Sequence, residues 1–241
     1  MADALVICLP TYNEAENIAY TVQAILSASP QAAVLITDDN SPDGTGAIAD
    51  QMAQKDPRIF VIHRPFKQGL GKAYCEGFHF AIEQLGADLI GQMDADFSHP
   101  PEFLPKMIAA ARTTDLVIGS RYTAGGGTKN WNTARRMISR FGSLYARTLL
   151  GLPVSDPTGG FKIWRRETLQ GVLNFPISSG GYVFQVETTF YAYRMGAAIS
   201  EVPIRFVERS TGKSKMTASI AFEAFRRIPM IRFRHRVIEK V

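Results

Sequence analysis

The sequence predicts an α/β fold, with a mostly parallel β-sheet flanked by helices on both faces. Short apolar runs typical of buried strands alternate with stretches of helical periodicity. Polar loops rich in Asn, Asp and Gly follow several of these runs, as expected for turns. Strands that alternate with helices form βαβ units and a parallel sheet, whose ligands bind at the carboxyl ends of the strands.

Five strands are expected in the first half, at 4–9, 33–37, 58–63, 88–93 and 115–120. Helices are expected between them, notably at 71–85 and 101–112. In the first helix, Ile18, Val22 and Ile25 share one face. Asn13 is expected to be its N-cap, with Glu16 three residues later.

The pattern changes after residue 122. The glycine-rich stretch "TAGGGTKNW" is expected to be a mobile loop. A basic helix, a turn with a strand, a second helix and a final strand should follow, at 132–150, 155–167, 181–196 and 199–210. The last segment alternates basic and apolar residues. We therefore expect one α/β domain over 1–216 and an amphipathic helical appendage over 217–241.

The composition is that of a globular protein, with 241 residues, 46% hydrophobic residues and a net charge of +5. This mild positive charge suits an anionic partner such as phosphate, nucleic acid or a membrane surface. Cys8 and Cys75 both fall in expected regular elements, which favours reduced thiols in a cytosolic compartment. The amino terminus reads as a strand rather than a signal peptide. Because no stretch reaches the roughly 18 apolar residues of a membrane span, a soluble or peripheral protein is expected.

Two common cofactor motifs are missing from the sequence. "KQGLGKAY" resembles a P-loop, but Phe66 stands where the first glycine belongs and Ala73 follows Lys72. No G-x-G-x-x-G follows a strand, which disfavours a nicotinamide cofactor. The four histidines lack metal-ligand spacing, and His99 is as consistent with a structural role as with a catalytic one.

The stretch "QMDADFSHP" ends an apolar run with two carboxylates, Asp94 and Asp96. On a strand, residues i and i+2 face the same side, so both acids are expected to point one way. Like charges this close repel unless a cation lies between them or one is protonated. Their oxygens suit Mg²⁺ or Mn²⁺, and a plain polar loop is the alternative.

Polar residues after the neighbouring strands are expected to share this crevice. Asp39 can accept hydrogen bonds from a nucleoside, Tyr12 can stack on a base, and Glu14 can bind a sugar hydroxyl. Asp43 and Gly44 fit a turn better. Basic side chains should flank the crevice, where arginine recognises phosphate: Arg121, Arg135, Arg136, Arg209, Lys213 and Lys215.

Eight motifs in order carry a family resemblance: "LPTYNEAENI", "DDNSPDGT", "GLGKAY", "MDADFSHPPE", "GSRY", "DPTGGFKIWRRE", "GYVFQVE" and "EVPIRFVERSTGKSKM". They resemble the inverting glycosyltransferases of family 2, which have the Rossmann-like GT-A fold, and most of all the dolichol- and polyprenol-phosphate mannose synthases among them. The resemblance covers about residues 4–217.

The resemblance implies the role of each site residue. The nucleoside pocket would be lined by Pro10, Tyr12, Glu14, Thr37 and Asp39. Asp94 and Ala95 would contact the sugar nucleotide, and Asp96 would be the principal metal ligand beside Asp94. The donor diphosphate would be held by Arg121, Arg209 and Lys215. The acceptor phosphate would be held by Arg121, Arg135 and Ser139. Asp96 and Arg121 are the expected catalytic residues, and Ser98 stands where some relatives have a metal-binding Gln.

The implied reaction is metal-dependent, inverting transfer of mannose from GDP-mannose to a polyprenyl (dolichyl-type) monophosphate, with Mg²⁺ or Mn²⁺. The alternatives are a glucosyltransferase that uses UDP-glucose and a non-catalytic subunit that binds a nucleotide sugar. The basic carboxyl-terminal helix is expected either to lie on the cytoplasmic face of a membrane or to cover the domain. A small membrane-spanning partner subunit is a further expectation. Nucleic acid is disfavoured, because the acids would repel a phosphate backbone.

Overall fold

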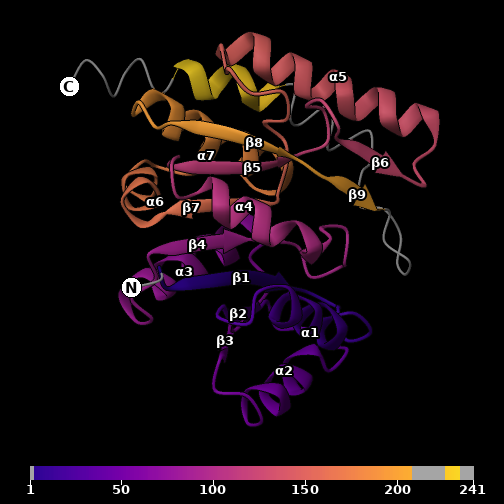
Figure 1. The fold of residues 1–241 in the computed structure, drawn as a ribbon, viewed down its shortest axis with the longest axis vertical. Helices are drawn as coiled ribbons and strands as arrows, with labels where there is room; N and C mark the ends of the chain where they lie inside the picture. The colour runs from indigo at the N-terminus through magenta and orange to yellow at the C-terminus, as the bar shows by residue number, and fades with distance from the viewer. Residues whose placement is uncertain (1–2, 208–225, 234–241) are drawn as a thin grey trace.

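A seven-stranded sheet forms the centre of the protein. The computed structural model describes residues 3–207 and 226–233. The sheet order is β3-β2-β1-β4-β7-β5-β8, and Figure 1 shows the strands stacked from β8 near the top to β3 near the bottom. The strands are β1 (Leu5–Thr11), β2 (Ala33–Asp38), β3 (Ile59–His63), β4 (Leu89–Gln92), β5 (Leu116–Ser120), β7 (Lys162–Arg165) and β8 (Ile199–Pro203). Only β7 runs antiparallel to its neighbours, so the expected mostly parallel α/β sheet is confirmed.

Helices cover both faces of this sheet. One core contains residues of α1 (Ile18–Ala28), α2 (Thr45–Ala53) and α4 (Leu104–Ala110). The other contains residues of α3 (Leu70–Glu83), α5 (Thr133–Leu150), α6 (Arg166–Leu173) and α7 (Gly181–Arg194). A short 3-10 helix, η1 (Pro101–Phe103), precedes α4. The chain therefore forms three layers, with the sheet in the middle.

The central strand β1 explains why there are two cores. Leu5, Ile7 and Leu9 belong to the first core, and Val6 and Cys8 belong to the second. Successive side chains of a strand point to opposite faces, so an apolar run fits a strand that is buried on both sides. Full burial of each such side chain contributes about 1.5–3 kcal/mol. This strand therefore fixes the middle of the sheet.

The expected N-cap of α1 is wrong. The helix begins at Ile18 after Asn17, and Asn13 has a φ of 59°, in the left-handed region. The backbone N–H of Asn13 instead donates to Ser41 Oγ, and that of Ala15 to Asp43 Oδ2. Contacts with the β2–α2 loop thus set the backbone conformation of Asn13 and outweigh its preference to cap the helix.

The glycine-rich stretch 123–131, expected to be a mobile loop, contains a strand. Strand β6 (Gly127–Lys129) pairs in parallel with β9 (Arg205–Val207). The single strand expected at 199–210 is accordingly two, with Ile204 between them bonded to both Ser120 and Gly127 through its backbone. Helix α6 was also not expected, because the sequence around 166 reads as the end of a strand.

The expected carboxyl-terminal helix is described only over 226–233, which is helical. Ile228 and Ile231 are buried in the second core, so this part of the segment covers the domain. Phe222 and Phe225 lie outside the described residues. No helix in the described parts of the chain is long and apolar enough to cross a membrane.

Candidate active site

A cavity of about 480 Å³ lies at the carboxyl edge of the sheet. It collects the loops that follow β1, β4 and β5, together with the loop before α7 and residue 206 of β9. Its wall includes most of the residues singled out from the sequence: Pro10, Tyr12, Glu14, Asp39, Asp94, Ala95, Asp96, Arg121, Arg135 and Ser139. The strand order therefore brings together residues that are more than a hundred positions apart.

Two expected residues of the described chain do not line this wall: Thr37, and Arg136, which is exposed on α5. Thr37 is buried where the sheet packs against α3. A Cβ added to Gly77 of α3 would lie only 3.0 Å from the Thr37 hydroxyl oxygen, so the packing there is close. Arg209 and Lys215 lie outside the described residues, so their roles stay predictions.

Tyr12 and Glu14 belong to the loop after β1, and contacts with neighbouring side chains position them. The Glu14 backbone N–H donates to Thr45 Oγ1 at 3.0 Å, and its carboxylate accepts from Asn17 Nδ2 at 3.0 Å. The ammonium group of Lys67 lies 3.5 Å from the centre of the Tyr12 ring. A base that stacks on Tyr12 would have to share that ring with a cation. Lys67 was not predicted to be a site residue.

The carboxylate of Asp39 already accepts hydrogen bonds from three groups. It accepts from Arg64 Nη1 at 2.5 Å and from the backbone N–H groups of Gln68 and Gly69 at about 3 Å. Both side chains of the ion pair are buried. Asp39 thus fixes the loop that leads into α3, and its predicted contact with the nucleoside has to compete with these bonds.

The two acids lie in a turn after β4, at the expected strand end and not within the strand. Strand β4 ends at Gln92, and residues 93–100 are irregular. Asp96 Oδ1 accepts from the Ser98 N–H at 3.0 Å, and Phe97 between them has a φ of 61°. A bulky residue in the left-handed region is strained, and such strain is commonly found at functional sites. The rule that i and i+2 face one way therefore does not apply, although both acids still line the cavity.

This turn suits a divalent cation that is completed by a ligand. Among residues 3–207 and 226–233, no three His, Cys, Asp or Glu side chains gather into an all-protein metal site. Mg²⁺ is commonly held by only one or two carboxylates, with substrate phosphates and water in its other positions. Asp94 and Asp96 supply that donor set at a cavity wall.

His99 supports the turn that contains Asp94 and Asp96. Its Nδ1 accepts the backbone N–H of Asp94 at 3.0 Å, and its ring stacks on Phe161. Burial lowers the pKa of His99, so the ring is neutral near pH 7 and its proton is on Nε2. The histidine thus has a definite tautomer and a definite contact, neither of which the sequence indicated.

Arg121 is fixed by a buried carboxylate. Asp156, which is fully buried, accepts from Arg121 Nε and Nη2, both at 2.7 Å. Burial opposes the charge of Arg121, but Asp156 outweighs it and the guanidinium pKa is raised. Thr158 Oγ1 also accepts from Nη2 at 2.8 Å. The arginine is therefore a permanent cation with a fixed orientation in the cavity wall.

Arg135 and Ser139 lie in the first turns of α5, close to Arg121. The Arg135 guanidinium carbon lies 4.3 Å from the centre of the Trp131 ring, and Tyr122 donates its hydroxyl to Ser139 Oγ at 2.7 Å. The buried indole Nε1 of Trp131 has no hydrogen-bond partner in the described part of the chain. This end of the cavity thus combines two arginines with an unsatisfied donor, which suits an anion.

Gln185 of α7 is a further lining residue that the sequence did not reveal. Its Oε1 accepts from Gln92 Nε2 at 2.5 Å, and Gln92 in turn accepts from Trp164 Nε1 at 3.1 Å. The buried Lys162 donates to the Gln185 carbonyl at 2.8 Å. The polar network fixes Gln185 so that its amide N–H groups are available to a ligand in the cavity.

Solved structures identify the fold. The chain superimposes with a TM-score of 0.68 on glucosyl-3-phosphoglycerate synthase from Mycobacterium tuberculosis in complex with Mn²⁺ and UDP-glucose. The two are 17% identical, and the match covers 95% of this chain and 78% of that one. The fold is thus the GT-A-like fold.

Sequence comparison gives the family. Residues 6–173 match glycosyl transferase family 2, and the chain belongs to that family. It is 50% identical over 216 residues to undecaprenyl-phosphate mannosyltransferase of Micrococcus luteus, covering 90% of this chain and 88% of that protein. It is 44% identical over 220 residues to polyprenol monophosphomannose synthase of Mycolicibacterium smegmatis, covering 90% and 83%.

Proposed function

We propose that the protein transfers mannose from GDP-mannose to a polyprenyl (dolichyl-type) monophosphate, giving a β-linked polyprenyl phosphate mannose. The observation that carries the proposal is a single cavity whose wall contains both an acidic turn and two arginines. An acid turn suits a cation bound to a diphosphate, and a separate pair of arginines suits a second phosphate. The names of the two relatives, at 50% and 44% identity, support mannose and a polyprenyl phosphate.

The donor would lie between Asp96 and Arg121. A nucleoside diphosphate leaves poorly until the negative charge that develops on it is neutralised. Arg121 supplies a fixed positive charge for this purpose, because Asp156 holds it in one orientation. Asp94 and Asp96 would hold Mg²⁺ or Mn²⁺, which when bound adds Lewis-acid stabilisation of the diphosphate. The Mn²⁺ of the solved structure with the same fold supports a divalent cation.

The acceptor phosphate would bind beside Arg135 and Ser139. A phosphate monoester is already an anionic nucleophile near neutral pH, so the reaction needs alignment rather than a strong general base. His99 fits this scheme as a structural residue, because its Nδ1 accepts the backbone N–H of Asp94. In-line attack on an α-linked donor inverts the anomeric carbon and gives the β product.

A lipid acceptor places the enzyme at a membrane. We propose a peripheral protein on the cytoplasmic face, where nucleotide sugars are available, with a small membrane-spanning subunit as a candidate partner.

The test is transfer of labelled mannose from GDP-mannose to a short polyprenyl phosphate in detergent, with Mg²⁺, Mn²⁺ or EDTA. Metal-dependent labelled lipid, lost in Asp96→Ala and kept in Asp56→Ala, is the expected result; Asp56 is an acid outside the cavity. Label from UDP-glucose alone would replace the sugar and keep the site. No transfer from either donor by folded protein would contradict the proposal.

A further inference from the structure

The side-chain amide of Gln185 has an orientation that its neighbours fix. The indole Nε1 of Trp164 is a donor only, so the side-chain oxygen of Gln92, 3.1 Å away, must be the acceptor. Gln92 therefore turns its Nε2 toward Gln185, whose Oε1 accepts from it at 2.5 Å. The Nε2 group of Gln185 is left on the other side of its amide with two N–H donors. All three residues are buried, so this chain of hydrogen bonds keeps the orientation.

The free donors of Gln185 belong to the cavity wall. Gln185 is 3% exposed and is one of the residues that line the cavity. Within residues 3–207 and 226–233, its Nε2 has no acceptor from the protein, and unlike the indole Nε1 of Trp131 it is not fully enclosed. A nearly buried donor group at a cavity wall requires an acceptor from a ligand or from water.

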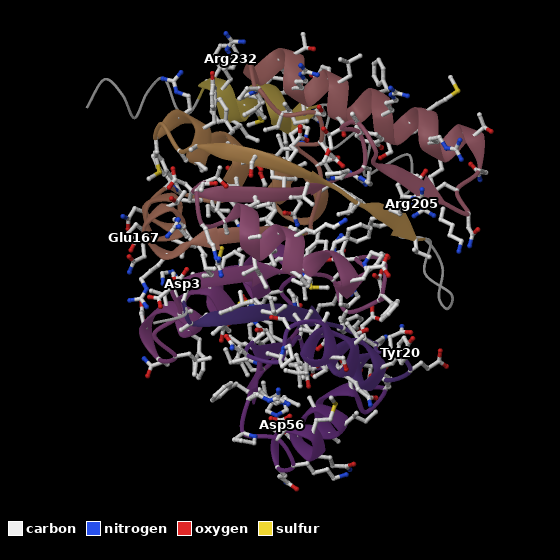
Figure 2. All side chains as sticks on the ribbon, viewed as in Figure 1. Asp3, Tyr20, Asp56, Glu167, Arg205 and Arg232 are labelled. Carbon is white, nitrogen blue, oxygen red and sulfur yellow. The ribbon has the colours of Figure 1, made fainter. Side chains whose placement is uncertain are left out.

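His99 provides a second neutral donor. Its Nδ1 accepts the Asp94 N–H, so the ring proton is on Nε2. The ring lies between Phe161, stacked at 5.3 Å, and Phe206, edge-on at 5.4 Å. Figure 2 shows Arg205 of β9 at the outer edge of the molecule, and the next residue, Phe206, lines the cavity. Besides supporting the acidic turn, His99 therefore has an N–H group in a fixed position.

Gly160 leaves the space beside both donors open. It lines the cavity, and a Cβ there would lie 3.4 Å from Gln185 Nε2 and 3.7 Å from His99 Nε2. The two nitrogens thus border one small space, which any side chain at position 160 would enter. The backbone does not require a glycine here, because the φ of Gly160 is not in the left-handed region. The missing side chain instead leaves room for the His99 ring and for a ligand.

This space lies between the two ends of the proposed reaction. His99 is bonded to Asp94 of the acidic turn, and Gly160 is two residues after Thr158, which accepts from Arg121. The transferred sugar has to lie between the diphosphate that leaves and the phosphate that attacks. Arginines in the wall are better phosphate ligands than uncharged N–H groups. The two neutral donors suit the hydroxyl oxygens of a sugar.

We propose that Gln185 is a specificity-determining residue, which together with His99 donates hydrogen bonds to hydroxyl oxygens of the transferred hexose. The inference rests on the proposed function for the presence of a sugar nucleotide in the cavity. The contacts from Trp164 through Gln92 keep Gln185 a donor and prevent its amide from rotating to suit another sugar. A hexose whose hydroxyl oxygen does not reach Gln185 leaves a polar group in the site unpaired, and such a loss discriminates strongly between substrates.

The test compares a sugar nucleotide with the nucleotide alone. The full chain is titrated with GDP-mannose and with GDP by calorimetry in the presence of Mg²⁺. Gln185→Met keeps the length of the side chain and removes both donors, so the Kd for GDP-mannose should rise about tenfold while the Kd for GDP stays the same. The matched control is Gln84→Met, the same change at an exposed position outside the cavity, which should alter neither Kd.

Gly160→Ala tests the space rather than the donors. Its methyl group would stand between Gln185 and His99, so the Kd for GDP-mannose should again rise while the Kd for GDP does not. An unchanged Kd for GDP also shows that each variant is folded. If Gln185→Met does not fold, the same comparison on Gly160→Ala decides.

Two outcomes would overturn the inference. Equal rises in the Kd for GDP-mannose and for GDP would make Gln185 a structural residue, and no rise in either would place the sugar elsewhere. Mannose transfer by the wild type with either outcome would leave the proposed function standing. UDP-glucose and UDP are titrated in parallel. Binding of UDP-glucose but not GDP-mannose by the wild type would contradict the proposed donor, and the sugar subsite is then judged on UDP-glucose against UDP.

Discussion

Asp156→Asn should cost far more stability than its position in a loop suggests. The substitution keeps the shape of the side chain and removes the charge opposite Arg121, whose side chain is 5% exposed while that of Asp156 is 0% exposed. The charges of a bidentate pair are about 4 Å apart, which at an effective dielectric constant of about 20 corresponds to roughly 4 kcal/mol. Removing one partner of a buried pair typically costs about 3–5 kcal/mol. A loss of this size is a large fraction of the total stability of a domain.

Urea unfolding followed by circular dichroism measures this loss. The matched control is Asp56→Asn, because Asp56 also forms a bidentate pair, with Arg58, but at the exposed surface. We expect little change there, since exposed ion pairs contribute little. The double variant Arg121→Met with Asp156→Asn should recover part of the lost stability, but it should not transfer the sugar because the Arg121 charge is missing. Equal midpoints for Asp156→Asn and the wild type would refute this account of Arg121.

Two further predictions concern buried groups around the cavity. His99→Leu leaves the Asp94 N–H without its acceptor and should lower the unfolding free energy by about 1–3 kcal/mol. His99→Asn, whose Oδ1 can replace Nδ1, should recover most of the loss, and equal losses in urea unfolding would exclude the bracing role. Burial lowers the pKa of Lys162 from 10.5 to about 7, so between these values the unfolded chain binds a proton that the folded chain does not. Stability from this group therefore rises with pH across that window, by about 1.4 kcal/mol per pH unit. Lys162→Met should flatten the curve of unfolding free energy against pH, and an unchanged slope would count against a neutral Lys162.

The sequence predicts the strands well where burial is complete. Strands β2 and β5 agree with the expected runs within one or two residues, because strands buried on both faces read as continuous apolar runs. Helix α5 also agrees closely with the basic helix expected at 132–150. The three-residue strand β6 could not be predicted, since it is too short to show a period and is glycine-rich.

The position of the cavity can be predicted from the sequence, but the contacts that support its wall cannot. Parallel-strand logic brings the loops of β1, β4 and β5 together, and most residues expected there do line the cavity. The residues around Asp156 do not reveal its role, because that role depends on an ion pair with Arg121, which lies 35 positions earlier in the chain. The predicted capping role of Asn13 is wrong for the same reason, since side chains from the β2–α2 loop outweigh its capping preference.

The position of β7 bears on how the protein is synthesised. Strands β4 and β5 follow one another in the chain but do not pair, since β7 lies between them and is made only after α5. Until β7 docks, two strand edges have unpaired backbone groups that other chains could join. Docking sets β4 and β5 two strand spacings apart, about 10 Å. A nascent chain therefore completes the cavity late, after β7 and then β9 have left the ribosome, and the edges of β4 and β5 stay open until then.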